Sequence, residues 1–340
     1  MIFASCSARS LRIGSVEVPN AVLLAPMAGI TDAPFRRVAA RFGAGLVISE
    51  MVASEALATG HAEMVLRLEG EGVPLHAVQL AGNEPAAMAR AAKIAENAGA
   101  VIIDINMGCP AKRVTTGLAG AALLRDLDLA TKILEAVVAA VEVPVTLKTR
   151  LGWDHGARTA PELARRAENA GIRLVTIHGR SRCQFYEGAA DWAAIAEVKQ
   201  SVGIPVIANG DLVRAADAPA MLAASGADGV MIGRGAQGRP WFPGQVAAQL
   251  RGGPVPADPP LAAQRDLLIE LYQGWLSHYG RALGMRQARK HVGWALEAAV
   301  GRGAPEAKAW RARLLTSERP DEVEAGIRAA YDDFSWRAAA

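Results

Sequence analysis

The sequence predicts an α/β protein, a TIM-type (β/α)₈ barrel followed by a small all-α helical bundle. Short apolar runs alternate with helical patterns eight times within the first 250 residues, which matches the strand count and size of such a barrel. Beyond that point the strand pattern stops, and only amphipathic helical patterns follow. These two observations define the predicted architecture.

The predicted barrel strands are short apolar runs bounded by turn residues. They cover Ala21–Ala25, Gly45–Ser49, His76–Leu80, Val101–Ile105, Val143–Lys148, Leu174–His178, Pro205–Ala208 and Gly229–Ile232. The alternative is a doubly wound open sheet, which usually has fewer strands and often a GxGxxG turn after the first. Here the first strand ends in Ala25-Pro26-Met27-Ala28-Gly29, which lacks that fingerprint and favours the barrel.

Helix start and stop signals lie between these strands. Starts are indicated by Thr31-Asp32 before Pro34, by Asn83-Glu84-Pro85, by Asp126 with Asp128, and by Thr159 with Pro161 and Glu162. Glycines just before the next strand are expected to be C-caps, at Gly99, Gly171, Gly203 and Gly226. Each strand is therefore expected to be followed by a helix.

The chain divides into three predicted parts. Residues 1–250 form the barrel, the Pro/Gly-rich segment 251–260 is a linker, and 261–340 form the helical domain. Four helices are predicted in the last part, over Leu261–Tyr279, Arg281–Val300, Pro305–Thr316 and Asp321–Ser335.

Composition excludes several classes of protein. With 340 residues, 51% hydrophobic residues and a net charge of +3, the chain suits a large packed core and is not strongly basic. Three widely spaced cysteines (Cys6, Cys109, Cys183) disfavour a disulfide framework or a CxxC metal site. No signal peptide or membrane-length apolar run is found. A cytoplasmic monomer without a metal or a membrane contact is expected.

Polar side chains follow every predicted strand. They are Pro26-Met27, Glu50, Gln79, Asn106 with Cys109, Lys148 with Arg150, His178 with Arg180, Asn209-Gly210-Asp211 and Gly233-Arg234. Because barrel active sites gather at the C-terminal ends of the strands, these residues are expected to share one site. The thiol of Cys109 is its reactive group, the alternative being a buried structural cysteine.

The last two turns favour a phosphate-bearing ligand. Asn209-Gly210-Asp211 and Gly233-Arg234-Gly235 offer backbone N–H groups where barrels often bind phosphate, and Arg234 adds a cation. A lysine at the end of a barrel strand, Lys148, also suggests an anion. Together they suggest a barrel that binds flavin mononucleotide (FMN). Alternatively, Lys148 is a surface lysine, or a partner of Glu50 or Asp104.

The helical part carries uneven charge between residues 281 and 313. Eight cations oppose two acids there, namely Arg281, Arg286, Arg289, Lys290, Arg302, Lys308, Arg311 and Arg313 against Glu297 and Glu306. This segment is either a solvated helix face or a surface that faces phosphates. Trp275, Trp294 and Trp310 are expected to belong to the core of the bundle.

These motifs resemble the tRNA-dihydrouridine synthases, flavoenzymes that reduce uridine in tRNA, and most closely their bacterial B-type branch. The resemblance covers nearly the whole chain. It rests on Ala25–Asp32, Asp104–Pro110 with Lys112, Val145–Arg150, His178–Gln184 with Tyr186, Gly188 and Asp191-Trp192, Ile207–Asp211, Met231–Gly235 and Arg286–Trp294.

The resemblance implies residue roles. Cys109 matches the proton donor. The FMN-binding positions are matched by Pro26, Met27, Ala28, Gln79, Lys148, His178, Asn209, Gly210, Asp211, Gly233 and Arg234. Asn106 and Arg180 match positions near the target uracil. The helical domain matches the part that helps hold tRNA, where Arg286, Arg289 and Lys290 are the candidate contacts.

The implied reaction adds a hydride and a proton to the C5=C6 bond of a uridine in the D-loop, with uridine 17 favoured. NADPH would reduce FMN, reduced FMN would give the hydride to C6, and Cys109 would protonate C5. A thiol suits this step because its pKa of about 8.5 leaves it protonated at neutral pH. Which of Asn106, Lys148, His178 and Arg180 stabilises the developing charge is left open, as is the choice between NADPH and NADH.

Two alternatives remain. One is an FMN barrel acting on a free pyrimidine, such as a dihydroorotate dehydrogenase. The basic helical appendage argues against it, because a small substrate needs none. The other is a tRNA-binding protein whose chemistry has lapsed. The intact set of polar residues at the strand ends argues against that.

Overall fold

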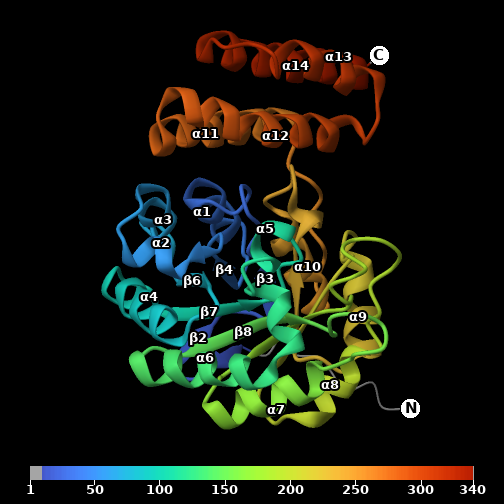
Figure 1. The fold of residues 1–340 in the computed structure, drawn as a ribbon. Coiled ribbons are helices and arrows are strands. Elements are labelled where there is room, and N and C mark those ends of the chain that lie inside the picture. The colour runs from blue at the N-terminus through green and yellow to red at the C-terminus, as the bar shows by residue number, and fades with distance from the viewer. Residues whose placement is uncertain (1–9, 340) are drawn as a thin grey trace, which may run out of the picture. The chain divides into compact units, whose positions relative to one another are not determined.

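A computed structural model describes residues 10–339 of the chain (Figure 1), so Cys6 and most of the N-terminal segment lie outside the described residues. Its contacts form two compact units. One unit runs to Gly235 and includes Pro243–Val255, and the other comprises Ala236–Phe242 and the described residues from Pro256 onward. The seven residues 236–242 thus group with the helical unit, although they precede the predicted linker.

The first unit is a closed parallel barrel. Its strands are β3 (Val22–Leu24), β4 (Leu46–Ile48), β6 (His76–Ala81), β7 (Ile102–Met107), β8 (Val145–Arg150), β9 (Val175–His178), β10 (Val206–Asn209) and β11 (Gly229–Ile232). They pair in the order β4-β3-β11-β10-β9-β8-β7-β6, and β6 pairs again with β4 to close the ring. The predicted fold class is confirmed, and each barrel strand overlaps a predicted one.

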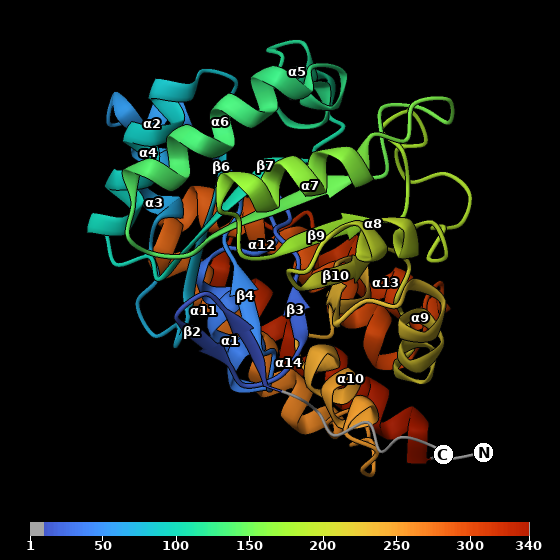
Figure 2. The same ribbon diagram turned by 90° about the horizontal axis from the view of Figure 1, so that it is seen from below.

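Helices surround the strands, as the view from below shows (Figure 2). The longer ones in this unit are α1 (Ala33–Arg41), α4 (Pro85–Asn97), α6 (Leu127–Ala140), α7 (Ala160–Ala170), α8 (Ile195–Ser201), α9 (Ala218–Ser225) and α10 (Phe242–Leu250). Shorter elements lie in the loops: α2 (Ser54–Ala58), α3 (Ala62–Arg67), α5 (Lys112–Thr115) and the 3₁₀ turns η1 (Gly120–Arg125), η2 (Ala215–Asp217) and η3 (Arg234–Ala236).

Most of the predicted helix signals work as expected. The Asp32 carboxylate accepts from the Phe35 N–H at 3.2 Å, and Asp126 accepts from the Leu129 N–H at 3.0 Å. Gly171 and Gly226 end α7 and α9 in the left-handed conformation. The prediction for Gly203 was wrong, because α8 already ends at Ser201 and its C-cap, Val202, is extended.

One element that the sequence analysis missed closes the N-terminal end of the barrel. Strands β1 (Leu11–Ile13) and β2 (Val16–Val18) form an antiparallel hairpin. The side chains of Leu11, Ile13 and Val18 are buried in one cluster with apolar residues from several barrel strands. The Gly14 turn lies beside Pro144, which precedes β8. The opposite, C-terminal end of the barrel is where the strand-end polar residues lie.

The second unit is helical. It contains α11 (Leu261–Tyr279), α12 (Arg281–Val300), α13 (Pro305–Leu314) and α14 (Pro320–Ala339), close to the predicted bounds. Trp275 is fully buried and stacks on His291 at a ring distance of 4.4 Å, as expected for a core residue. Trp294 and Trp310 are only half-buried. Within residues 10–339, no helix combines the length and apolarity needed to cross a membrane.

Candidate active site

Three side chains inside the barrel form a hydrogen-bonded chain across β6 and β7. The Gln79 amide donates from Nε2 to Asp104 Oδ2 at 2.7 Å, and Asn106 Nδ2 donates to Gln79 Oε1 at 2.8 Å. The second Asp104 oxygen accepts from the Thr146 hydroxyl at 2.6 Å. All four side chains are buried. Because water cannot reach them, these hydrogen bonds supply partners that their polar atoms would otherwise lack.

This series of hydrogen bonds ends at the loop that carries Cys109. Asn106 Oδ1 accepts from the backbone N–H of Gly108 at 3.1 Å and of Cys109 at 2.9 Å. The Cys109 carbonyl accepts from the Ala121 N–H at 3.1 Å. Cys109 itself is half-buried, and its sulfur is a free thiol. The loop that carries the thiol is therefore held on both sides at the C-terminal end of β7.

Lys148 lies in the same interior and resolves one of the open alternatives. Its Nζ donates to Asn209 Oδ1 at 3.2 Å, and Asn209 Nδ2 in turn donates to the Met231 carbonyl at 2.8 Å. Burial, together with repulsion from Arg150, lowers the pKa of Lys148 to about 8. Lys148 is thus not a surface lysine, and its cation is only partly compensated.

Glu50, which the sequence analysis considered as a partner of Lys148, makes other contacts in the structure. Its carboxylate accepts from the Gly29 N–H and lies 3.8 Å from Arg67. The Met27 N–H donates to Thr31 Oγ1 at 2.8 Å within the same loop. Glu50 therefore anchors the Pro26–Thr31 loop after β3.

Glycines bring the remaining strand ends close together. A Cβ placed on Gly210, whose φ is +126°, would lie 2.6 Å from the Ala190 Cβ and 3.1 Å from His178 Cδ2. A Cβ on Gly233 would meet Met27 Sδ first, at 3.7 Å. Burial, and then the nearby cations, keep the pKa of His178 well below its usual range, so its imidazole is neutral.

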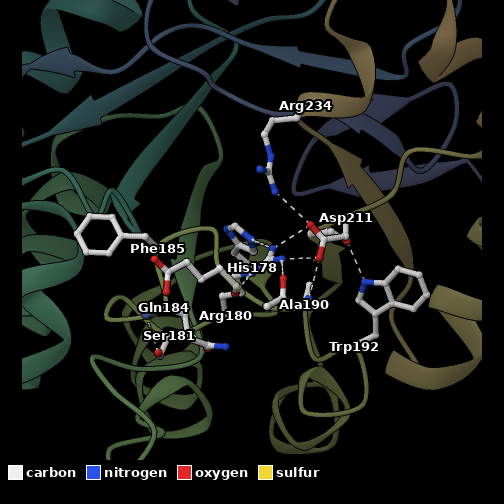
Figure 3. A network of polar contacts seen from close by, with 12 residues as sticks. His178, Arg180, Ser181, Gln184, Phe185, Ala190, Trp192, Asp211 and Arg234 are labelled. Carbon is white, nitrogen blue, oxygen red and sulfur yellow. Dashed lines mark hydrogen bonds and ion pairs between the residues drawn. The ribbon is translucent and has the colours of Figure 1, made fainter. Parts of the chain in front are cut away.

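Arg180 and Asp211 form a tight ion pair at this end of the barrel (Figure 3). Arg180 Nη2 lies 2.5 Å from Asp211 Oδ2, and Arg234 Nη2 lies 3.2 Å from the other oxygen. Burial opposes the charged carboxylate, but the hydrogen bonds from Arg180 and the Ala190 N–H outweigh it and lower the pKa of Asp211.

The same guanidinium also donates to the carbonyls of Glu187 and Gly188 and contacts His178 Nε2, so its five N–H groups are all occupied. Arg180 is 1% exposed. In this structure it anchors the turn at Asp211, which stands at a φ of +55°, and its contact with a substrate stays a prediction.

Comparison with known proteins identifies the family. The family model described as "Dihydrouridine synthase (Dus)" matches residues 23–335. The chain belongs to the dihydrouridine synthase family. A probable tRNA-dihydrouridine synthase of Rhodobacter capsulatus is 53% identical over 327 residues, covering 95% of this chain and 98% of that protein. tRNA-dihydrouridine synthase B of Xanthomonas axonopodis is 45% identical, covering 95% and 96%.

Solved structures share the fold at low identity. Histamine dehydrogenase from Rhizobium sp. 4-9 aligns with a TM-score of 0.55 at 14% identity, over 78% of this chain and 50% of that one. 6-Hydroxypseudooxynicotine amine oxidase from Pseudomonas geniculata aligns with the same TM-score at 16% identity, over 77% and 52%. These likenesses support the barrel of this synthase-family chain.

Two further residues of this synthase-family site had no assigned role in the sequence analysis. Arg150 is 2% exposed, and its guanidinium donates to the carbonyls of Gly108, Ser181 and Phe185 at 2.8 to 2.9 Å. Tyr186 is exposed. The guanidinium carbons of Arg234 and Arg150 lie over its ring, 4.8 Å and 5.6 Å from the ring centroid, as in cation–π contacts. Arg150 stands at a strand end and Tyr186 belongs to one of the quoted motifs, so the sequence offered a reason to consider both. Their contact partners, however, are set by the fold.

The three predicted RNA-contact residues of the helical unit differ in how exposed their side chains are. Arg286 is exposed, while Arg289 and Lys290 are half-buried on the same helix, α12. Arg289 lines a small cavity with Tyr272, and Lys290 Nζ donates to Gln287 Oε1 at 2.6 Å. Within residues 10–339, no cluster of His, Cys, Asp and Glu could hold a metal ion.

Proposed function

We propose that this chain is a flavin-dependent tRNA-dihydrouridine synthase that reduces the C5=C6 bond of a uridine in tRNA. The observation that carries the proposal is the geometry around Cys109. A thiol stands at the mouth of the barrel on a loop held by Asn106, within a chain whose family membership covers residues 23–335. The relatives named as tRNA-dihydrouridine synthases span almost the full chain.

We assign the flavin to the C-terminal end of the barrel, as FMN. Gly233 leaves room beside Met27, and Gly210 lets the turn after β10 pack against Ala190 and His178. The cation of Lys148, which burial destabilises enough to lower its pKa to about 8, would be stabilised by an anion bound beside it. Pro26, Ala28, Gln79, Asn209, Asp211 and Arg234 complete the proposed FMN-binding set. When bound, FMN supplies the hydride that no side chain can give.

The chain's own residues supply the proton and the electrostatics. Cys109 gives a proton to C5 of the uracil. Lys148 and Asn106, which pair in register on β8 and β7 beside the cysteine loop, are our candidate donors for the carbonyl charge that develops, since the N–H groups of Arg180 are already occupied. The target base must be flipped out of the folded RNA to reach them.

The remaining parts of the proposal follow from the resemblance. Residues 1–250 are the catalytic domain, 251–260 connect it, and 261–340 hold tRNA through cations such as Arg286, Arg289 and Lys290. NADPH is the reductant and uridine 17 of the D-loop the favoured target. The protein acts as a monomer in the cytoplasm. Family membership argues against the free-pyrimidine alternative, and the retained Cys109 site argues against a lapsed enzyme.

The cofactor assignment predicts that the purified protein is yellow with non-covalent FMN. Lys148→Met is expected to weaken FMN binding by about 10- to 100-fold, because a hydrogen bond to a charged group contributes about 1.5 to 3 kcal/mol. Lys132→Met, at an exposed position on α6, is the matched control and is expected to bind FMN normally. Fluorescence titration of the apoprotein measures both. A colourless protein that binds no added FMN would rule out the assignment.

A further inference from the structure

The hydrogen-bonded chain from Asp104 to Cys109 has a direction that is fixed at both ends. At one end, two backbone N–H groups face Asn106, so the Asn106 amide must present its oxygen to them and its Nδ2 to Gln79. Gln79 must then present Oε1 to Asn106, which leaves its Nε2 for Asp104. At the other end, the Asp104 carboxylate accepts the hydrogen bond that Gln79 Nε2 donates in this arrangement.

We propose that Asp104 is a positioning residue that fixes the orientation of the Gln79 amide and thereby steadies Asn106 and the loop that carries Cys109. This inference rests on the proposed function for its consequence in catalysis. Asp104 itself lies two residues before Asn106 on β7, and its hydrogen bonds lead to the cysteine loop through Gln79 on the neighbouring strand.

Burial makes this orientation depend on Asp104. Asp104 and Gln79 are each 1% exposed and Asn106 is 8% exposed, so water cannot take the place of a missing partner. Without an acceptor at position 104, no hydrogen bond holds Gln79 Nε2, so rotation of the Gln79 amide no longer breaks one there. Asn106 Nδ2 then loses the fixed acceptor that Gln79 Oε1 provides, so the Asn106 side chain holds the Gly108 and Cys109 N–H groups less firmly.

Thr146 provides a built-in comparison, because it bonds to the other Asp104 oxygen and is not part of the path to the cysteine. Thr146→Val removes a hydrogen bond of the same buried carboxylate but leaves the Gln79 contact in place. Asp104→Asn keeps an oxygen for Gln79, with its amide N–H₂ directed at the Thr146 hydroxyl, which can accept. Asp104→Leu keeps the approximate volume and removes the acceptor.

The first test is the single-turnover rate at which flavin-loaded, pre-reduced enzyme reduces tRNA. Asp104→Leu is expected to be about 100-fold slower, the usual cost of a small misplacement of a reacting group. Asp104→Asn and Thr146→Val are expected to stay close to the wild-type rate. A flavin-loaded Asp104→Leu enzyme with the wild-type rate, or an Asp104→Asn enzyme as slow as Asp104→Leu, would overturn the proposal.

The second test does not depend on the reaction. In a background where Cys6 and Cys183 are replaced by serine, iodoacetamide alkylates Cys109 alone. Asp104→Leu is expected to change that rate several-fold, while Thr146→Val leaves it unchanged. If wild-type enzyme forms no dihydrouridine, the proposed function fails, yet this rate still tests the positioning role. An unchanged alkylation rate in Asp104→Leu would contradict it.

A second variant covers the case in which Asp104→Leu folds poorly. Gln79→Met breaks the chain at its middle with little change of volume. If Asp104 acts through Gln79, Gln79→Met is expected to change the alkylation rate of the flavin-free protein several-fold. A wild-type alkylation rate in folded Gln79→Met would overturn the proposal.

Discussion

Replacing Cys109 with alanine is expected to abolish nearly all reduction of tRNA while the protein keeps its fold and its flavin. General acid catalysis contributes about 10²- to 10⁴-fold, and among residues 10–339 no other thiol lies at the end of β7. The backbone of Cys109, not its sulfur, makes the hydrogen bonds to Asn106 and Ala121, so alanine preserves them. The measurement is the rate of dihydrouridine formation at saturating tRNA.

Cys183→Ala is the matched control for this experiment. Cys183 is the other described cysteine, and it lies exposed in the loop after β9. Its removal is expected to leave the rate unchanged. Wild-type turnover by a Cys109→Ala enzyme would remove the proton-donor role, and the flavin spectrum of the variant shows whether a loss of activity comes instead from loss of cofactor.

Neutralising Arg286, Arg289 and Lys290 together is expected to weaken tRNA binding by about 10- to 100-fold at moderate salt. Each lost phosphate contact also flattens the dependence of log Kd on log salt concentration by about 0.7 to 0.9. Arg286 is expected to carry the largest share, because it is the exposed member of the three. Filter binding or fluorescence anisotropy over a range of salt concentrations measures both effects.

The helical unit offers a matched control with the same change in charge. Arg319, Arg328 and Arg337 are cations of that unit that pair with Asp321, Glu324 and Asp333 at 2.7 to 2.9 Å. Because carboxylates already compensate them, their joint replacement by glutamine is expected to affect tRNA binding much less. Binding that is independent of salt, or equal losses in the two triple variants, would contradict the assignment of α12 to tRNA.

The barrel was predictable because its strands are buried on both faces and therefore stand out as short apolar runs. The β1–β2 hairpin was not, since two three-residue strands around Gly14 give too short a pattern to detect. Likewise β5 (Val52–Ala53) is a two-residue extension beside the end of β6. Such elements depend on tertiary packing, which a single sequence does not express.

The site was predictable as a set of residues but not as a network. Strand ends predicted that Gln79, Asn106 and Lys148 meet, but strand register decides that Gln79 stands opposite Asp104 and Asn106 opposite Lys148. Resemblance suggested a substrate contact for Arg180. In the structure its guanidinium is committed to Asp211 and two carbonyls, a pairing between residues 31 positions apart.

The most direct test of the proposed function is dihydrouridine formation, mapped by position, in unmodified tRNA incubated with the purified protein and NADPH. Free uridine and orotate serve as control substrates. The expected result is dihydrouridine in tRNA alone, at a single D-loop position, with uridine 17 as the favoured site. If the protein carries flavin that NADPH reduces, yet leaves tRNA unmodified or reduces a free pyrimidine, the synthase assignment is contradicted.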